Sequence, residues 1–345
     1  MIRGTNMQEG GQALDVPSCD SCDHPAIIVQ EYSGRVMCSK HLAKSIRKKI
    51  SKELRQQLPL EKGRMTTIFV AISGGKDSAV LLDALVDILG QRRDVNIIAG
   101  TVDEGIEGYR PPSLICAQNL CESLGIEFIT ISYKELQFMD MDVVARRLPM
   151  VVEQHNDAPR MPCAYCGVFR RQGINYLAKQ VGADIVALGH NLDDMAQTVL
   201  MNLTNGDVER TLRLAPHTMT PLDELAPRIV PLRWVPEQEV HLYALHRKLP
   251  IHHEECPHAR GALRWRQREM VALMERDVPG TRHGLVRAAD HIKALRDKIS
   301  DLGGSASKLN PPNPCVTCGE LTSGHQCKAC DMRSLLGIEF KEDSQ

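Results

Sequence analysis

Short apolar runs and longer stretches that are apolar on one face alternate along the middle of the chain. The short runs contain consecutive apolar and β-branched residues, which is typical of buried strands; they lie at 67–72, 95–100, 126–131 and 184–188. The apolar-rich stretches 79–86 and 113–124 predict helices between them. Strands that alternate with helices predict an α/β fold, a mostly parallel sheet with helices on both faces, over residues 61–249.

A long helix is predicted ahead of this segment, from residue 42 to residue 58. Its apolar residues recur at every fourth position, and Pro59 ends it; they are Ile46, Ile50, Leu54 and Leu58. The other face is basic, with Lys44, Arg47, Lys48, Lys49, Lys52 and Arg55. Such a face is either a solvated helix surface or a contact for a phosphate backbone, and the local sequence favours neither.

The first strand-like run leads into a glycine-rich turn, Ser73-Gly74-Gly75-Lys76-Asp77-Ser78. Two glycines allow the backbone to turn tightly and approach a ligand, and the N–H groups that begin the next helix attract an anion. This turn, which we call the phosphate loop, therefore predicts a phosphate site. It is not a Walker A loop, because Lys76 directly follows the glycine pair and the G-x-x-x-x-G-K-[ST] spacing is absent.

A second polar turn follows the last strand-like run, with the sequence Gly189-His190-Asn191-Leu192-Asp193-Asp194. Ligands of open parallel sheets collect at the carboxyl ends of the strands, where both turns emerge. We therefore expect the phosphate loop and residues 189–194 to converge on one crevice.

Composition and the absence of long apolar runs predict the cellular compartment. The chain has 345 residues, with 42 Lys and Arg against 43 Asp and Glu, so no overall charge argues for nucleic acid. No apolar run approaches the roughly 18 to 20 residues that cross a bilayer, and the N-terminus lacks the apolar core of a signal peptide. We expect a cytoplasmic protein without membrane contact, in which the 12 cysteines are not a disulfide framework.

Cysteine spacing at both ends is typical of zinc. The N-terminal ligands pair as C-x-x-C and C-x-x-H, at Cys19, Cys22, Cys38 and His41. The C-terminal ligands form two C-x-x-C pairs, at Cys315, Cys318, Cys327 and Cys330. These patterns predict a zinc finger with a basic helix over 1–60 and a zinc ribbon over 309–345, which has too small a core to fold without metal.

Three further cysteines, Cys163, Cys166 and Cys256, which we call the mid-chain thiols, have no obvious fourth ligand. They suit a [4Fe–4S] cluster with one open iron, but spacing alone is equally compatible with a zinc site, a redox pair or a disulfide relay. Cys116 and Cys121 lack metal spacing, and we expect them only to pack in a helix.

Residues 250–308 form a fourth predicted segment, which holds Cys256 and ends in a glycine–serine linker at 303–307. Four arginines flank Trp265 in it: Arg260, Arg264, Arg266 and Arg268. Three glutamates partly offset this charge, so the stretch is either a solvated helix or a surface for RNA.

Four ordered motifs carry a resemblance to a known family: residues 73–78, 102–110, 163–171 and 189–194. In this order, and with zinc modules at both ends, the chain resembles the tRNA 2-thiolation enzymes of the PP-loop ATP pyrophosphatase superfamily. These comprise the cytosolic wobble-uridine thiolases and the ribothymidine thiolases. The similarity extends over nearly the whole chain.

The resemblance implies a set of site residues. ATP would be bound by Ser73, Gly74, Gly75, Lys76, Asp77, Ser78, Gly189 and His190. Lys76 would neutralise the leaving pyrophosphate, and Asp77 and Asp194 would hold Mg²⁺ or arrange the base. Cys163, Cys166 and Cys256 would hold the [4Fe–4S] cluster and act in catalysis.

The implied reaction is ATP-dependent synthesis of 2-thiouridine in tRNA. The C2 oxygen of uridine is adenylylated and then replaced with sulfur delivered at the cluster, with AMP and pyrophosphate as products. The run from Cys166 to Gln172 resembles the branch that modifies uridine 34; position 54 is the alternative. Family resemblance also implies a homodimer that receives sulfur from a ubiquitin-like thiocarboxylate carrier or from free sulfide.

Two other functions compete with this one. Another PP-loop ligase acting on tRNA, of the amide or lysidine type, would leave the mid-chain thiols without a role. A zinc-dependent RNA-binding protein without turnover would not require the phosphate loop.

Overall fold

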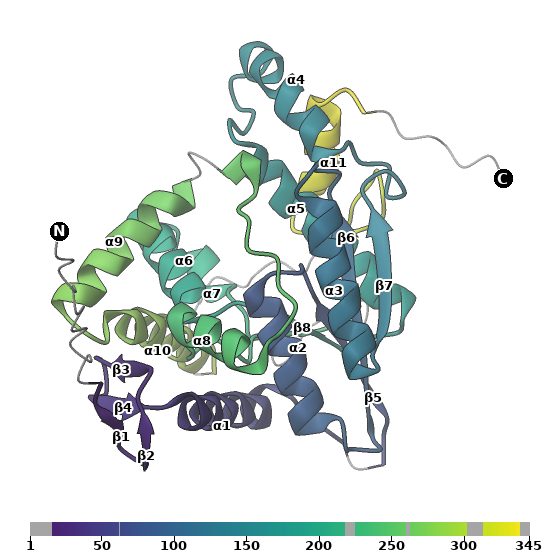
Figure 1. The fold of residues 1–345 in the computed structure, drawn as a ribbon. Coiled ribbons are helices and arrows are strands. Elements are labelled where there is room, and N and C mark those ends of the chain that lie inside the picture. The colour runs from purple at the N-terminus through teal and green to yellow at the C-terminus, as the bar shows by residue number, and fades with distance from the viewer. Residues whose placement is uncertain (1–15, 62, 218–224, 260–262, 302–312, 339–345) are drawn as a thin grey trace, which may run out of the picture.

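A parallel sheet lies at the centre of the computed structural model, which describes residues 16–61, 63–217, 225–259, 263–301 and 313–338 (Figure 1). Its strands are β5 (Thr66–Ala71), β6 (Val95–Asp103), β7 (Glu127–Ser132), β8 (Ile185–Ala187) and β9 (Arg228–Ile229), in the order β7-β6-β5-β8-β9. All four neighbouring pairs are parallel, which confirms the predicted fold class. The two-residue strand β9 is too short to show a hydrophobic period in the sequence, so it was not predicted.

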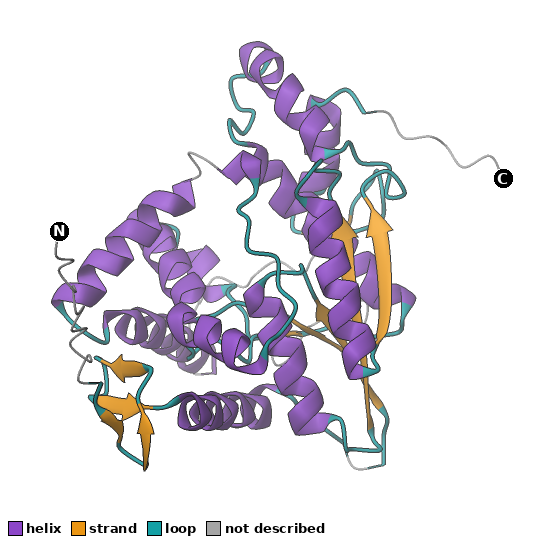
Figure 2. Cartoon of the chain, viewed as in Figure 1, coloured by secondary structure: helices purple, strands orange, loops and turns teal. Residues whose placement is uncertain are grey.

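Helices cover both faces of this sheet, as Figure 2 shows. In β5, Ile68 and Val70 pack with the core on one face, and the intervening Phe69 packs with the core on the other. The first face is covered by α1 (Ser39–Gln57), α2 (Lys76–Leu89), α3 (Arg110–Leu124) and α8 (Glu237–Arg247). The second is covered by α4 (Met141–Gln154) and α5 (Pro162–Gln180).

The N-terminal module consists of two small hairpins followed by α1. The hairpins pair β1 (Ser18–Cys19) with β2 (Cys22–Pro25) and β3 (Ile28–Gln30) with β4 (Arg35–Met37). The predicted apolar stripe of α1 is buried, but its basic face is not uniformly free. Lys49 pairs with Glu239 at 3.0 Å and Arg47 pairs with Asp87, whereas Lys44, Lys48, Lys52 and Arg55 are exposed.

A helical bundle flanks the sheet beyond β8. It contains α6 (Leu192–Thr204), α7 (Val208–Leu212), α9 (Leu263–Asp277) and α10 (Thr281–Asp301). A small core of its own joins α6, α9 and α10, with Leu192, Met195, Ala196, Val271 and Val286. Arg260, the side chain of Arg264 and the predicted linker at 303–307 lie outside the described residues.

The C-terminal module is a hairpin of β10 (Asn313–Pro314) and β11 (Leu321–Thr322) followed by α11 (Lys328–Leu335). It packs beside α4 and α5, at the opposite end of the molecule from the N-terminal module (Figure 1). Within the described part of the chain, no helix combines the length and apolar character needed to cross a membrane.

A buried carboxylate fixes α2, and therefore the phosphate loop ahead of it, against α8. Asp83 is 2% exposed. It accepts hydrogen bonds from the Tyr243 hydroxyl at 2.7 Å and from two nitrogens of Arg247 at 2.9 and 3.1 Å. Because removing one partner of such a network leaves the others unpaired, we expect Asp83→Ala to lower the free energy of unfolding by about 3 kcal/mol.

The measurement is urea unfolding followed by circular dichroism. Asp87→Ala is the matched control on the same helix, because its ion pair with Arg47 is partly exposed. That pair is expected to contribute less than about 1 kcal/mol. Equal losses in the two variants would contradict the anchoring role of Asp83.

Candidate active site

The phosphate loop connects β5 to α2 and is held by its own serines. The Ser73 N–H donates to Ser78 Oγ at 3.0 Å, and Ser78 Oγ donates to the Gly75 carbonyl at 3.1 Å. Gly74 has φ of +82°, and a Cβ there would lie 2.0 Å from the Ser113 carbonyl oxygen, so only glycine fits. No side chain caps the start of α2, which leaves its first N–H groups available to an anion.

Lys76 lies at the first turn of α2 between two carboxylates. Its Nζ donates to Asp77 Oδ2 at 3.1 Å and to Glu237 Oε1 at 2.8 Å. Burial opposes the charge of Lys76, but Asp77 and Glu237 outweigh it and raise the pKa of the amine. Lys76 is therefore a fixed positive charge beside the helix N-terminus.

The turn that follows β8 lies beside the phosphate loop, as expected. A Cβ on Gly189 would be 3.0 Å from the Ser78 backbone nitrogen. Asn191 caps α6 in a reciprocal capping box with Asp194, and its Nδ2 donates to Asp77 Oδ1 at 2.8 Å. Burial and the charge of Asp194 raise the pKa of Asp77, against the opposing effect of Lys76.

One cavity of about 500 Å³ opens beside these groups. Its walls include Cys163 and Cys166 from the first turn of α5, Cys256 from the segment after α8, and the carboxylates Asp194 and Glu237. The structure thus brings all three mid-chain thiols together with two acidic groups, of which Glu237 contacts Lys76 of the phosphate loop and Asp194 contacts Asn191. His190 is exposed and is not among the described residues that line the cavity.

The mid-chain thiols are half-buried or buried and have polar neighbours. Cys166 Sγ accepts a hydrogen bond from Arg170 Nη2 at 3.2 Å, and Cys163 Sγ donates to the His258 carbonyl at 3.5 Å. Burial and the neighbouring thiols raise the pKa of Cys163 and of Cys256. Arg170 places a positive charge beside the Cys166 sulfur.

The spacing of the mid-chain thiols differs from that of a single-ion site. Among the described residues, three or more Cys, His, Asp or Glu ligand atoms lie within 4.8 Å of one another only in the two terminal groups, so the mid-chain thiols are spread more widely. An iron–sulfur cluster binds each thiolate through a different iron, so its ligands are spread more widely than those of one ion. Three thiols around one cavity fit such a cluster better than they fit zinc.

A buried carboxylate, Glu104, connects the thiols to the phosphate loop. Its oxygens pair with Arg110 Nε at 2.5 Å and with Arg170 Nε at 2.6 Å. Arg110 also donates to the Ser73 carbonyl at 2.9 Å, and Arg170 donates to the Cys166 thiol. The chain Ser73–Arg110–Glu104–Arg170–Cys166 therefore fixes the two halves of the site relative to each other.

Several of these residues had no assigned role in the sequence analysis. Glu104, Arg110 and Arg170 lie inside motifs that it singled out, so their motif positions were the available signal. Glu237 gave no signal, because its contact with Lys76 joins residues that are 161 positions apart.

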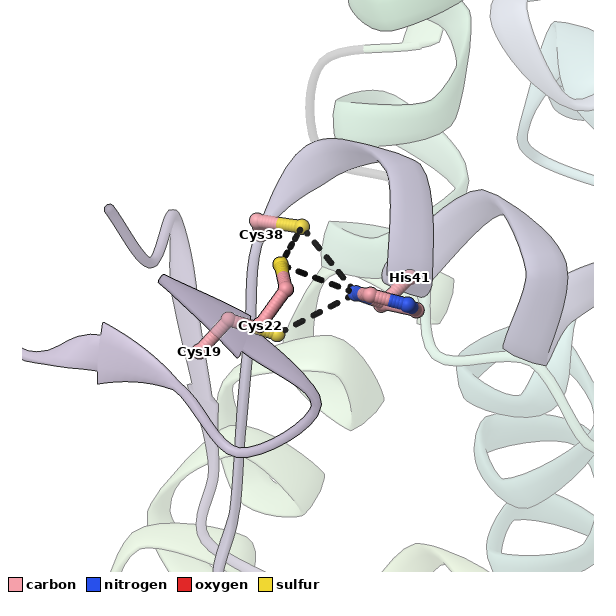
Figure 3. A group of neighbouring side chains, drawn as sticks. All are labelled: Cys19, Cys22, Cys38 and His41. Carbon is pink, nitrogen blue, oxygen red and sulfur yellow. Dashed lines mark hydrogen bonds between the residues drawn. The ribbon is translucent and has the colours of Figure 1, made fainter. Parts of the chain in front are cut away.

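The N-terminal metal-ligand group is compact (Figure 3). His41 Nδ1 lies 3.4 Å from each of the sulfurs of Cys19, Cys22 and Cys38. Burial opposes the thiolate, but hydrogen bonds from the backbone of Cys38 and Ser21 lower the pKa of Cys19 to about 6. Three thiols and one imidazole at this spacing fit a closed tetrahedral zinc site.

The C-terminal group has the same character. The sulfurs of Cys318 and Cys327 are 3.6 Å apart, and the Cys327 N–H donates to the Cys315 sulfur at 3.2 Å. Cys330 completes the set. Asn175 Nδ2 of α5 donates to Glu320 at 2.7 Å and joins this module to the helix that carries Cys163 and Cys166.

Comparisons with known proteins agree with this geometry. A family model described as a PP-loop domain matches residues 42–269. The chain is 35% identical over 322 residues to the tRNA 2-thiolation protein NcsA of Haloferax volcanii, covering 90% of this chain and 97% of that protein. It is 34% identical over 274 residues to cytoplasmic tRNA 2-thiolation protein 1 of Saccharomyces cerevisiae, covering 79% and 73%.

A solved structure is similar over nearly the full length. It is the U34-tRNA thiolase NcsA from Methanococcus maripaludis with its [4Fe-4S] cluster. The TM-score is 0.76 at 30% sequence identity, and the match covers 94% of this chain and 98% of that chain.

The phosphate loop leads to the first prediction on the site. Gly74→Ala would combine a positive φ with a clash against Ser113, so we expect ATP affinity to fall by at least about ten-fold in calorimetric titration. Gly63→Ala is the matched control, since Gly63 has φ of +85° but open space around it. The role of the loop would be refuted if both variants bound ATP like the unaltered protein.

The terminal metal groups lead to a prediction on zinc content. We expect about two zinc ions per chain by elemental analysis. Cys327→Ser should remove one of them and lower the thermal midpoint, because the small C-terminal module depends on its metal. Cys116→Ser, on α3 and outside both groups, should retain two. A full zinc content in Cys327→Ser would overturn the assignment of this site.

Proposed function

The chain belongs to the PP-loop family of tRNA 2-thiolation proteins, and from this we propose that it is an ATP-dependent tRNA-uridine 2-sulfurtransferase. Its target is uridine 34. One observation carries the proposal: the mid-chain thiols share a cavity with Asp194 and Glu237, next to the phosphate loop. A ligase without sulfur chemistry has no use for those thiols, and an RNA-binding protein has no use for that loop.

The first half of the reaction activates the base. The C2 oxygen of uridine attacks the α-phosphorus of ATP, so a C–O–P linkage forms and pyrophosphate leaves. The N–H groups at the start of α2 and the charge on Lys76 bind the phosphates and stabilise the negative charge that develops on the leaving group. Ser73, Gly74, Gly75 and Ser78 shape this phosphate site, and Gly189 lies beside Ser78. His190 would join the ATP site, as the family resemblance implies.

Two carboxylates are suited to a magnesium ion. Asp77 and Asp194 both contact Asn191. Besides burial, the charge of Asp194 raises the pKa of Asp77, and a divalent cation would relieve that repulsion. Oxygen ligands of this kind bind Mg²⁺ together with substrate phosphates.

The second half replaces the activated oxygen. A sulfur nucleophile attacks C2, the C2–O bond breaks, and AMP leaves with the former carbonyl oxygen. Cys163, Cys166 and Cys256 would hold a [4Fe–4S] cluster, which supplies an iron open to exogenous sulfide. Arg170 orients the Cys166 thiol, while Glu104 holds Arg170 in place.

The cavity contributes to the reaction by holding the base and the sulfur in position. Because its walls include both the thiols and the acidic groups next to the phosphate loop, base and sulfur meet at a fixed distance instead of by diffusion. The named relatives support tRNA as the substrate. We also propose a cytoplasmic homodimer that takes sulfur from free sulfide or from a ubiquitin-like thiocarboxylate carrier, in keeping with the family resemblance.

The decisive experiment supplies anaerobically purified protein with ATP, Mg²⁺, sulfide and transcribed tRNA. We expect 2-thiouridine at position 34 by mass spectrometry of nuclease fragments, and we expect the purified protein to contain about four irons per chain. Thiolation at position 54 instead would assign the protein to the other branch of the family.

Serine variants test the mid-chain thiols. Cys163→Ser, Cys166→Ser and Cys256→Ser should each reduce product formation at least about 100-fold and lower iron content, because the sulfur would no longer be held in position. Both zinc ions should remain. Cys116→Ser, which lies on α3 away from the cavity, should behave like the unaltered protein. Full activity in all three variants would eliminate the proposed role of the thiols.

A further inference from the structure

An aromatic side chain with an arginine above it lines the same cavity. Trp265 and Arg268 lie three residues apart on α9, and both contribute to the cavity wall. The guanidinium carbon of Arg268 is 5.7 Å from the centroid of a Trp265 ring. Arg268 Nη2 is also 3.4 Å from Glu237 Oε2, while the other oxygen of Glu237 accepts from Lys76.

Packing does not account for Trp265. The side chain is 47% exposed, whereas Val271 anchors α9 to the core of the bundle. The chain has one other tryptophan, Trp234, which does have a structural role: it stacks on His283 with the rings inclined by 12° and lies under Arg233. An indole at the wall of a substrate cavity, half open to solvent, offers exposed ring surface on which a base can stack.

A uridine in a folded tRNA cannot present C2 inside a cavity while it remains stacked between its neighbours. Enzymes that act on a nucleobase therefore take it out of the stack and compensate the lost stacking with aromatic rings or arginine planes. The base is uncharged, so it suits a stacking face, whereas the ATP phosphates are drawn to Lys76 and the start of α2.

On these grounds, and resting on the function proposed above, we propose that Trp265 and Arg268 form a platform on which the flipped target uridine stacks. The platform places the base in the cavity between the mid-chain thiols and the phosphate loop. Glu237 forms ion pairs with both Arg268 and Lys76. The side chain that would contact the base and the side chain that would contact the ATP phosphates are therefore connected through one carboxylate.

Tryptophan fluorescence tests the platform without any need for turnover. In a Trp234→Phe protein, Trp265 is the single tryptophan, and we expect its emission to be quenched on addition of substrate tRNA. The reciprocal Trp265→Phe protein retains only Trp234 and should show little change. If tRNA binds, as followed separately by filter binding, and Trp265 emission is unaltered, the platform is refuted.

Kinetics supply a second test with a matched control. Trp265→Ala should lower kcat/KM for tRNA on the order of ten- to hundred-fold, the loss expected when a base loses its stacking partner. Trp265→Phe should retain most of the activity, and ATP binding without tRNA should be unchanged in both. Leu273→Ala alters another exposed apolar residue of α9 that does not line the cavity, and it should leave kcat/KM unaltered.

The outcomes separate this inference from the proposed function. Thiolation by the unaltered protein with Trp265→Ala indistinguishable from Leu273→Ala would refute the platform and leave the sulfurtransferase in place. Quenching of Trp265 by tRNA without any thiolated product would refute the sulfurtransferase and leave the platform as a base-binding site.

Discussion

The arrangement of the site depends on one buried carboxylate. Glu104 follows β6 and pairs with two guanidinium groups, one of which holds the phosphate loop at the Ser73 carbonyl and the other the thiol of Cys166. A charge that is taken out of water must be paired, and the loss of one partner leaves the rest uncompensated. Glu104 therefore imposes a fixed relation between the phosphate loop and the Cys166 thiol, which lie about 90 residues apart in the chain.

The fold makes this relation possible through the strand order of the sheet. β5 has β6 on one side and β8 on the other. The chain therefore continues from β5 toward one edge of the sheet, through β6 and β7, and then returns past β5 to add β8 and β9 at the other edge. Such a switch point separates the loops that follow adjacent strands and opens a crevice at their carboxyl ends. The phosphate loop follows β5 and residues 189–194 follow β8, and the two turns lie side by side where Gly189 approaches Ser78.

Local sequence was sufficient to predict the phosphate loop and the elements on either side of it. A β-branched run, a glycine pair and an apolar stretch define β5, the phosphate loop and α2, with a shift of one residue for β5 and of three residues at each end of α2. Ligand spacing was sufficient for the terminal metal groups as well, because C-x-x-C and C-x-x-H pairs bring their side chains together within one turn. These features depend on neighbours in the chain, and local patterns report on such neighbours.

Other parts of the site depend on partners that are distant in sequence. Glu237 and Arg268 meet only because α9 packs on α6 through Leu192, Met195 and Val271, a core that no periodicity in one segment reveals. The basic face of α1 shows the same effect, since Lys49 appeared available from its position but is committed to Glu239. The sequence of a helix shows which residues are charged, but it does not show which of them form ion pairs with residues elsewhere in the fold.

The first turn of α8 also contacts the N-terminal metal module. Glu239 is buried and accepts hydrogen bonds from Gln30 at 2.7 Å and Lys49 at 3.0 Å, as well as from the Tyr32 hydroxyl. Two residues earlier, Glu237 holds Lys76 of the phosphate loop. Gln30 and Tyr32 belong to the hairpin that the Cys19, Cys22, Cys38 and His41 group closes. A metal bound by this group would hold the hairpin in place and, through Gln30 and Tyr32, would also hold the helix turn from which Glu237 contacts Lys76.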